Sequence, residues 1–397
     1  FKFLIPFAVI LIPLFLSIFF GLAVLSSGKF SEKKIHFILL FALVFSLFEF
    51  LRGNILTGFP WNLIAYTWSW SVSNIQILSI IGTYSLSLIS ITLFCIPFLF
   101  LKNFFSKSNI IFAVLFLVIF SSNYLYGKYK ISNTDYKFDT NINVKIISPN
   151  FSLEEYNNKE EKLQLERLIK ISDPDKNKKT LFIWPEGIFY ESYLQDIKIY
   201  KKLFKNNFSD NHLIALGINN LFKSDDSRDI KYFNSLVIVN NDLEILHVYN
   251  KIKLVPFGEF LPLENFFSKF GFKKITRGYN SFSSGNKRIL LKLDDKLVLP
   301  LICYEIIYPG QIKTKKQFPD LVINISEDAW FGQSIGPHQH FSKAIYRSIE
   351  EGIFIARSAN KGISAYINPN GQVIKSLHTG ESGNIEINFP YFAESTI

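Results

Sequence analysis

Hydrophobic and polar residues follow two different patterns along this chain. Up to about residue 126, long apolar runs that carry almost no charge alternate with short loops. Four of these runs are long enough to cross a bilayer: Phe3–Leu25, His36–Leu51, Ile75–Leu101 and Asn109–Leu125. A soluble core would need four such segments in succession, so residues 1–126 are predicted to form transmembrane helices.

From about residue 140 to residue 390, short apolar segments alternate with turn residues and amphipathic stretches. This pattern predicts strands at Asn143–Ile147, Thr180–Trp184, Leu213–Gly217, Tyr232–Val239, Glu244–Tyr249, Arg288–Leu293, Lys296–Ile302, Leu321–Ile325, Ile353–Arg357, Ile363–Ile367 and Asn384–Ile387. Helices are expected at about Asn157–Ser172, Leu194–Phe204 and Pro337–Glu351. Hairpins mixed with strand–helix units predict a layered α/β domain whose sheets are covered by helices.

The composition supports this division and excludes some classes of protein. The chain is 48% hydrophobic with a net charge of +10, and its lysines are scattered rather than clustered, so an anionic lipid surface suits it better than nucleic acid. Two cysteines cannot build a disulfide framework. Because the chain begins inside an apolar run and contains no methionine, we expect its true start to be missing.

The loops between the predicted spans indicate an orientation. The loop joining the first two spans and the loop joining the last two contain lysines, whereas residues 52–74 contain one basic residue. The lysines concerned are Lys29, Lys33, Lys34, Lys102 and Lys107. By the positive-inside rule these loops are cytoplasmic, so the domain that follows the fourth span lies outside the cytoplasm.

The loop predicted on the outer side begins with two charges and continues with a cluster of aromatic residues. Glu49 and Arg52 are three residues apart, which places them on one helical face where they can pair. The aromatic residues are Trp61, Tyr66, Trp68 and Trp70. They either anchor a helix at the lipid headgroups or form the floor of a cleft through which lipid enters.

The segment Leu297–Gly310 contains the candidate nucleophile. An apolar run ends at Cys303, Glu305 follows two residues later, and Pro309 and Gly310 close the segment. This order predicts a buried strand that delivers a thiol to a tight turn. The alternative is a core cysteine, because free cysteine is among the most buried residue types.

Two other charged residues follow apolar runs and complete a possible catalytic set. A thiol at neutral pH is mostly protonated, and Glu186 could accept its proton. Lys251 could stabilise the thiolate and the oxyanion that forms when a carbonyl is attacked. Taken singly, Glu186 is better explained as a surface carboxylate and Lys251 as a solvated lysine.

Metal and serine chemistry find little support. His338 and His340 lie two apart, which on a helix points them to different sides, and no further Cys/His cluster completes a zinc site. A Gly-x-Ser-x-Gly elbow and a phosphate-binding glycine loop are also absent from the sequence.

Several segments together resemble the bacterial apolipoprotein N-acyltransferases, which are membrane-embedded members of the nitrilase (carbon-nitrogen hydrolase) superfamily. The segments are Trp184–Glu186, Tyr249–Glu259, Cys303–Glu305 and Asn324–His340. Val-Pro-Phe-Gly-Glu and Asp-Ala-Trp-Phe-Gly are highly specific in combination. The resemblance covers nearly the whole chain, because Thr57–Trp61 is also similar to the outer loop of the family.

The resemblance implies an αββα sandwich on the outer face of the inner membrane, here within residues 140–390, and a monomer without a cofactor or metal. It implies acyl transfer in two steps, from a membrane phospholipid to the cysteine nucleophile and then to an apolipoprotein. Carried over by position, Cys303 is the nucleophile, Glu186 the general base and Lys251 the oxyanion-stabilising residue. The supporting or substrate-binding residues are Glu259, Tyr304, Glu305, Trp330 and Trp61.

The chain also departs from the family pattern. The family usually has eight spans, and here the first ones and the last are absent, as expected of a fragment. Ser148–Leu153 and Tyr156 stand where the family typically has Gln-Pro-Asn-Ile-Pro-Gln and soon a tryptophan, and Glu327 stands where asparagine is more usual.

Two other functions use the same residues differently. A membrane-anchored amidase of the nitrilase type would apply the same three catalytic residues to a small soluble amide. A non-catalytic sensor or lipid-binding scaffold on the same fold would leave Cys303 unreactive towards alkylating reagents at neutral pH.

Overall fold

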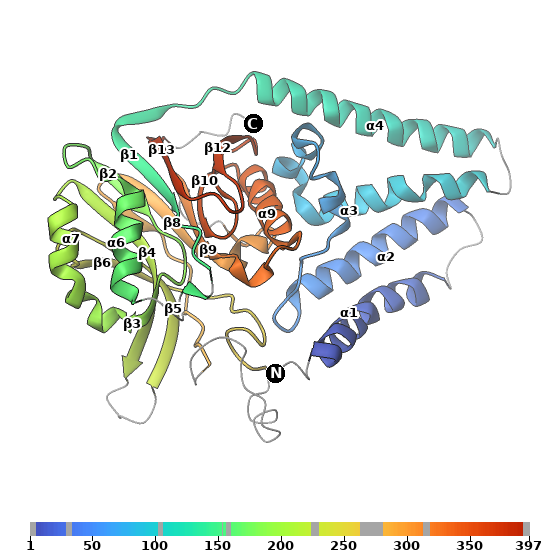
Figure 1. The fold of residues 1–397 in the computed structure, drawn as a ribbon. Coiled ribbons are helices and arrows are strands. Elements are labelled where there is room, and N and C mark those ends of the chain that lie inside the picture. The colour runs from blue at the N-terminus through green and yellow to red at the C-terminus, as the bar shows by residue number, and fades with distance from the viewer. Residues whose placement is uncertain are drawn as a thin grey trace. The chain divides into compact units, whose positions relative to one another are not determined.

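A computed structural model describes residues 5–28, 34–101, 106–152, 154–155, 160–223, 230–262, 281–312 and 318–391 (Figure 1). The chain divides into two compact units. The first comprises Phe1–Thr134 with Tyr308–Gln311, and the second comprises Asp135–Ile307 with Ile312–Ile397.

The first unit is helical. Its long helices are α1 (Ile5–Ser27), α2 (Lys34–Asn54), α3 (Leu78–Cys95) and α4 (Lys107–Ser132), and all four are long and apolar enough to cross a membrane. The third predicted span differs from a single helix: Gly82 has a φ of 74° inside α3, and a 3₁₀ helix, η4 (Ile96–Phe100), follows it. The membrane character expected from the apolar runs is therefore confirmed, although one run is kinked.

The connection between α2 and α3 is folded against the helices by buried polar groups. The Glu49 and Arg52 side chains lie 4.0 Å apart, as their spacing predicted. Glu49 Oε1 accepts a hydrogen bond from the backbone N–H of Ile64 (3.0 Å), and Arg52 Nη2 donates to the carbonyl of Asn62 (3.0 Å). The pair thus holds the loop backbone as well as lowering the cost of burying two charges.

The second unit contains two sheets, each with parallel strands in its centre and antiparallel strands at its edges. The first has the order β13-β1-β2-β4-β5-β6, with β3 also pairing β4, and the second has the order β12-β11-β10-β9-β8-β7. The strands of the first sheet are β1 (Phe138–Ser148), β2 (Thr180–Ile183), β3 (Phe189–Tyr193), β4 (His212–Lys223), β5 (Ile230–Val239), β6 (Ile245–Asn250) and β13 (Gly383–Pro390). Those of the second are β7 (Leu291–Leu293), β8 (Lys296–Ile302), β9 (Leu321–Glu327), β10 (Phe354–Asn360), β11 (Ser364–Ile367) and β12 (Val373–Leu377).

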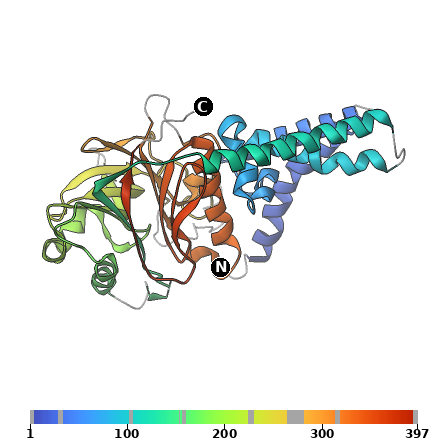
Figure 2. The ribbon, with the colours of Figure 1, turned by 90° about the horizontal axis from the view of Figure 1, so that it is seen from above.

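The two sheets pack face to face, and helices cover their outer faces (Figure 2). Apolar residues of both sheets, such as Ile146 and Ile323, share one buried core. Helices α6 (Glu161–Ser172) and α7 (Lys201–Asn207) cover the first sheet, and α9 (Gly336–Glu351) covers the second. This arrangement is the predicted αββα sandwich, so the predicted fold class is confirmed.

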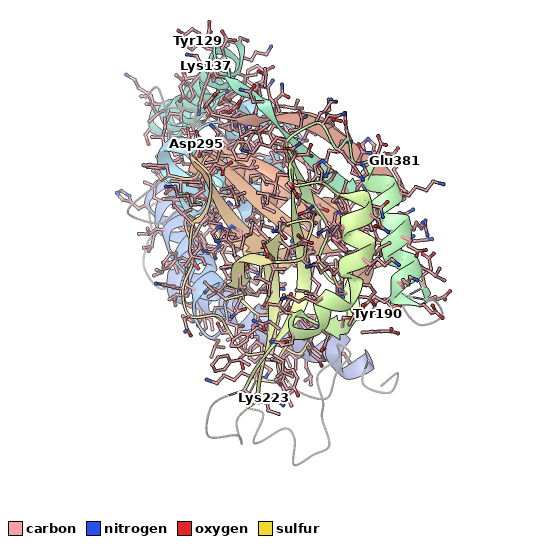
Figure 3. All side chains as sticks on the ribbon, turned by 90° about the vertical axis from the view of Figure 1, so that its left-hand side faces the viewer. Tyr129, Lys137, Tyr190, Lys223, Asp295 and Glu381 are labelled. Atoms are coloured by element: carbon pink, nitrogen blue, oxygen red, sulfur yellow. The ribbon has the colours of Figure 1, made fainter. Side chains whose placement is uncertain are left out.

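The parallel strands of both sheets point the same way. Lys223, at the carboxyl end of β4, and Asp295, just before β8, lie at opposite ends of this unit in Figure 3. The segments that follow β2, β6, β8 and β9 therefore emerge at one edge of the sandwich. Parallel α/β sheets place their binding and catalytic groups at this carboxyl edge.

The structure differs from the sequence prediction mainly at sheet edges. Strands β3 and β12 were not predicted, and most of β12 is exposed, so it shows little apolar alternation. Helix α6 begins at Glu161, whereas the predicted start, Asn157, lies outside the described residues. The same holds for Phe3, where the first span was predicted to begin, for the loop lysines Lys29, Lys33 and Lys102, and for Leu153 and Tyr156.

Candidate active site

Glu186 follows β2 and lies at the carboxyl edge of the first sheet. Its Oε1 accepts hydrogen bonds from Asn234 Nδ2 (2.6 Å) and Lys251 Nζ (3.3 Å), and its Oε2 accepts one from the backbone N–H of Glu327 (3.0 Å). A Cβ added at Gly217 would lie 2.7 Å from Glu186 Cα, so only glycine lets β4 pass this close. The carboxylate is therefore fixed by donors from three different strands or strand ends.

Lys251 follows β6 and is almost completely buried between two carboxylates. Its Nζ lies 2.9 Å from Glu259 Oε1 and 3.3 Å from Glu186 Oε1. Burial by itself lowers the pKa of this ammonium group, but the charges of Glu186 and Glu259 outweigh burial and raise the pKa above its ordinary value. Lys251 is therefore held as a cation at the site.

Asn234, on β5, is a site residue that the sequence analysis missed. Its Nδ2 donates to Glu259 Oε1 (2.8 Å) as well as to Glu186, so one amide group bridges the two carboxylates. The second oxygen of Glu259 accepts from the backbone N–H of Val255 (2.9 Å). An asparagine inside a predicted strand carries no sequence signal of this role, because only strand pairing places it between two acids.

Cys303 begins a short 3₁₀ helix, η7 (Cys303–Ile307), directly after β8. Its φ is 48°, in the left-handed region that a residue with a Cβ rarely adopts. Glu305 holds this turn, because its Oε2 accepts from the N–H of Ile302 (2.8 Å) and its Oε1 accepts from Tyr249 Oη (2.7 Å). The predicted strand followed by a tight turn is thus what the structure contains, with Glu305 as its internal brace.

The thiol of Cys303 interacts electrostatically with both Glu186 and Lys251. Burial has the largest effect and raises the thiol pKa, and the charge of Glu186 raises it further. The charge of Lys251 lowers it, but by less, so the net shift is upward. Lys251 therefore favours the thiolate, as expected from the sequence, but burial and Glu186 outweigh it and the thiol keeps its proton at neutral pH.

A second buried network adjoins the nucleophile. Asp328 Oδ2 accepts from Arg357 Nη2 (2.7 Å), and Asp328 Oδ1 accepts from Ser326 Oγ (2.7 Å) and lies 2.9 Å from His340 Nδ1. The thiol, the Asp328 carboxylate and the His340 ring place their ligand atoms within 4.8 Å of one another. His338, two residues before His340 on α9, is exposed, so the predicted divergence of the two histidines is confirmed.

Glu327 is a buried acid beside this site. Both of its carboxyl oxygens accept from Asn360 Nδ2 (3.0 and 2.9 Å), and Oε1 also accepts from the N–H of Ala329 (3.0 Å). Burial, followed by the charges of Glu186 and Asp328, raises its pKa to about 8. The carboxyl group is therefore mostly protonated at neutral pH.

The structure brings five of the predicted site residues together at the carboxyl edge of the sandwich. The five are Glu186, Lys251, Glu259, Cys303 and Glu305. Tyr304 is buried in η7 next to the nucleophile, whereas Trp330 is 54% exposed in the 3₁₀ helix Ala329–Phe331. Trp61 belongs to the first unit, where its ring stacks on Phe59 with centroids 6.4 Å apart.

Two family models match this chain. A carbon-nitrogen hydrolase model matches residues 170–389, and a model of the apolipoprotein N-acyltransferase N-terminal domain matches residues 1–96. The two matches correspond to the α/β sandwich and to the helical segment that precedes it.

Curated relatives match over nearly the full chain. An apolipoprotein N-acyltransferase from Rickettsia prowazekii is 33% identical over 385 residues, which cover 96% of this chain and 76% of the relative. An apolipoprotein N-acyltransferase from Bradyrhizobium diazoefficiens is 30% identical over 410 residues, and the match covers 100% of this chain and 76% of the relative. Among solved structures, a CN-hydrolase superfamily protein from Xanthomonas campestris gives a TM-score of 0.44 at 13% identity, over 62% of this chain and 89% of that one.

Proposed function

Because this chain belongs to the apolipoprotein N-acyltransferase family, we propose that it transfers an acyl chain from a glycerophospholipid, through a thioester on Cys303, to an apolipoprotein. The acceptor is the N-terminal amino group of a cysteine that already carries a diacylglyceryl group. The observation that carries the proposal is the buried group in which the Cys303 thiol interacts with Glu186 and Lys251.

In the first step, the Cys303 sulfur attacks the carbonyl carbon of a phospholipid ester while Glu186 accepts the thiol proton. The carbonyl oxygen becomes an oxyanion, and the buried ammonium of Lys251 stabilises it. When the tetrahedral intermediate collapses, the ester C–O bond breaks and Glu186 returns the proton to the leaving alkoxide. The products are a Cys303 thioester and a lysophospholipid.

In the second step, the amino group of the apolipoprotein attacks the thioester carbonyl. Glu186 accepts a proton from the amine, and Lys251 again faces the developing oxyanion. The C–S bond then breaks, an amide remains, and the thiolate recovers its proton from Glu186. The net reaction moves one acyl group from an ester to an amine and requires neither a cofactor nor a metal ion.

The raised pKa of the Cys303 thiol supports the role of Glu186 as a base. A preformed thiolate would need no base, whereas a protonated thiol must lose its proton during the attack. Asn234 and Glu259 hold Glu186 and Lys251 in register for this transfer. Tyr304 and Glu305 flank the nucleophile, and we assign acyl-chain contacts to Trp330 and Trp61.

Both proposed substrates are anchored in a bilayer, which suits a chain with four helices that can span a membrane. A membrane-bound enzyme searches for such substrates locally rather than through bulk solution. We further propose that the protein is a monomer in the bacterial inner membrane, with the sandwich on the periplasmic side.

The proposal can be tested with the full chain in mixed micelles that contain a phospholipid with a labelled acyl chain. Wild type should form an adduct on the Cys303 peptide that hydroxylamine removes, and it should release lysophospholipid. Cys303→Ala should give neither product. Cys95→Ala, which removes the other cysteine from a helix of the first unit, should behave like wild type.

Three results would refute the proposal. One is a base-labile adduct that persists in Cys303→Ala. Another is hydrolysis of small amides by the wild type without release of lysophospholipid, which would indicate the amidase function. The third is a Cys303 thiol that does not react with alkylating reagents at neutral pH, which would indicate a non-catalytic scaffold.

A further inference from the structure

Asp328 is a fully buried carboxylate directly after β9 that contacts three neighbouring side chains. Arg357, on the adjacent strand β10, donates to its Oδ2, and Ser326 donates to its Oδ1. Strands β9 and β10 are parallel with Asn324 opposite Arg357, and the two side chains are also hydrogen-bonded. The guanidinium therefore compensates the charge of Asp328 inside the protein, as a buried carboxylate requires.

The Asp328 carboxylate is connected to Cys303 through two side chains, Ser326 and His340. Ser326 donates its hydroxyl proton to Asp328 Oδ1, so its oxygen can only accept from the Cys303 S–H with which it interacts. His340, whose Nδ1 lies 2.9 Å from the same Oδ1, has its Nε2 3.3 Å from the Cys303 carbonyl oxygen. One buried group is thus linked both to the reacting atom of the nucleophile and to its backbone.

His340 faces an acceptor at each ring nitrogen, the Cys303 carbonyl oxygen at Nε2 and Asp328 Oδ1 at Nδ1. A carbonyl and a carboxylate oxygen can only accept hydrogen bonds, so the charged ring donates to both, and a neutral ring donates to the Cys303 carbonyl in its Nε2–H form. In that form, Nδ1 accepts from Arg357 Nη2 at 3.1 Å. Burial and Arg357 lower the pKa of His340 and Asp328 raises it.

The backbone of the nucleophile is in a conformation that needs such support. Cys303 has a φ of 48°, and a residue with a Cβ stays in the left-handed region only when its surroundings hold it there. Glu305 holds the N–H side of this turn through Ile302, and His340 holds the carbonyl side. The two contacts together restrain the backbone on both sides of Cys303, at the Leu301–Ile302 peptide and at the Cys303–Tyr304 peptide.

We propose that Ser326, Asp328 and His340 form a positioning network that orients the Cys303 sulfur, because the network contacts both the thiol and the carbonyl of Cys303. The inference rests on the proposed function only in that this sulfur is the group that attacks. None of the three residues touches the acyl group: Asp328 acts through the other two, which act on Cys303. Geometry of this kind is costly to lose, because a displacement of about 1 Å can slow a reaction about a hundredfold.

A matched pair of substitutions separates the two contacts of His340. The side-chain nitrogen of glutamine can take the place of Nε2, whereas that of asparagine takes the place of Nδ1. His340→Gln should therefore keep the donor to the Cys303 carbonyl, and His340→Asn should lose it while still facing Asp328. His338→Gln, at the exposed histidine on the same helix, is the control.

The readout is the rate at which iodoacetamide alkylates Cys303 in the detergent-solubilised full chain, followed by mass spectrometry of the Cys303 peptide between pH 6 and 9.5. At neutral pH, His340→Asn should react at least about tenfold more slowly than wild type, and His340→Gln within about threefold. Ser326→Ala removes the hydroxyl that connects Asp328 to the thiol, so it should also react at least about tenfold more slowly than wild type. Melting temperatures measured on the same samples verify that each variant is folded.

The inference is overturned if folded His340→Asn and His340→Gln react at equal rates, or if folded Ser326→Ala reacts as fast as wild type. Alkylation requires neither acyl donor nor acceptor, so it can fail or succeed independently of the proposed function. Slow alkylation in His340→Asn, in a protein whose wild type never releases lysophospholipid, would support the network and refute acyl transfer.

Discussion

Glu327 should make the stability of the folded protein depend on pH, and its burial determines both the sign and the size of that dependence. The side chain is buried at the end of β9 and its pKa is raised from 4.5 to about 8. Glu327→Gln removes the titration and keeps an oxygen that can accept from Ala329 N–H and Asn360. We predict that this variant is the more stable protein at pH 8 and slightly the less stable one at pH 5.

The direction of the stability change follows from how many protons the folded and unfolded chains bind. Below pH 4.5 the carboxyl group is protonated in both the folded and the unfolded chain. Between pH 4.5 and about 8 the unfolded chain loses this proton and the folded chain keeps it, so the stability of wild type falls as the pH rises. Over the three pH units from 5 to 8, at 1.36 kcal/mol each, wild type should lose about 4 kcal/mol relative to the variant.

The loss of one hydrogen bond partly offsets the stability that Glu327→Gln gains at high pH. The glutamine NH₂ cannot accept from Asn360 as Glu327 Oε2 does, which costs the variant about 1 kcal/mol at every pH. The net result is an advantage for Glu327→Gln of about 3 kcal/mol at pH 8. In a domain of this size each 1 kcal/mol shifts the melting temperature by about 2–4 °C, so the variant should melt about 6–12 °C higher.

The assay is thermal unfolding of the detergent-solubilised full chain, followed by intrinsic tryptophan fluorescence at half-unit steps from pH 5 to pH 8.5. Glu166→Gln, which removes an exposed carboxylate from α6, should give a curve parallel to that of wild type. If the curve of Glu327→Gln is also parallel to wild type, then Glu327 does not hold a proton in the folded state and the reasoning from burial is wrong.

Two further substitutions test how the site is held. Gly217→Ala would place its Cβ 2.7 Å from Glu186 Cα, so it should lower both the melting temperature and the rate of thioester formation, whereas Gly383→Ala, with contacts of 3.6 Å, should change neither. Tyr249→Phe removes the hydroxyl that donates to Glu305 Oε1 at 2.7 Å, so it should cost about 1.5–3 kcal/mol of stability and slow alkylation of Cys303. An unchanged alkylation rate in folded Tyr249→Phe would contradict the role of Glu305 as the brace of the turn.

The fold could be predicted from the sequence wherever an element buries a continuous apolar face. All central strands were predicted, because each is an apolar run that ends at turn residues, and β8 with its following cysteine is the clearest case. The missed strand β12 has three exposed residues of five, and β3 pairs with a single neighbour. Edge strands of this kind gain little from burial, so their sequences show little pattern.

The candidate site was predictable only in part. Glu186, Lys251 and Cys303 could be proposed because a base, a cation for the oxyanion and a nucleophile are the groups that acyl transfer needs. Asn234 and Arg357 could not be found this way, because their roles depend on which strands are neighbours and in what register. Arg357 faces Asn324 only because β9 and β10 pair in parallel, which no local pattern specifies.

The thiol shows why residue types are not sufficient to predict the chemistry. From the sequence, a lysine near Cys303 suggested a stabilised thiolate, but the structure buries this thiol and places Glu186 and Glu259 around Lys251. With two carboxylates around one ammonium, a thiolate would add a further negative charge that the buried site does not compensate. In the proposed mechanism, the sulfur therefore becomes nucleophilic as its proton passes to Glu186, and this transfer leaves the charge of the site unchanged. Glu327, whose backbone N–H donates to Glu186, is buried beside the same negative charges. A further uncompensated carboxylate is therefore unfavourable there, and Glu327 keeps its proton at neutral pH.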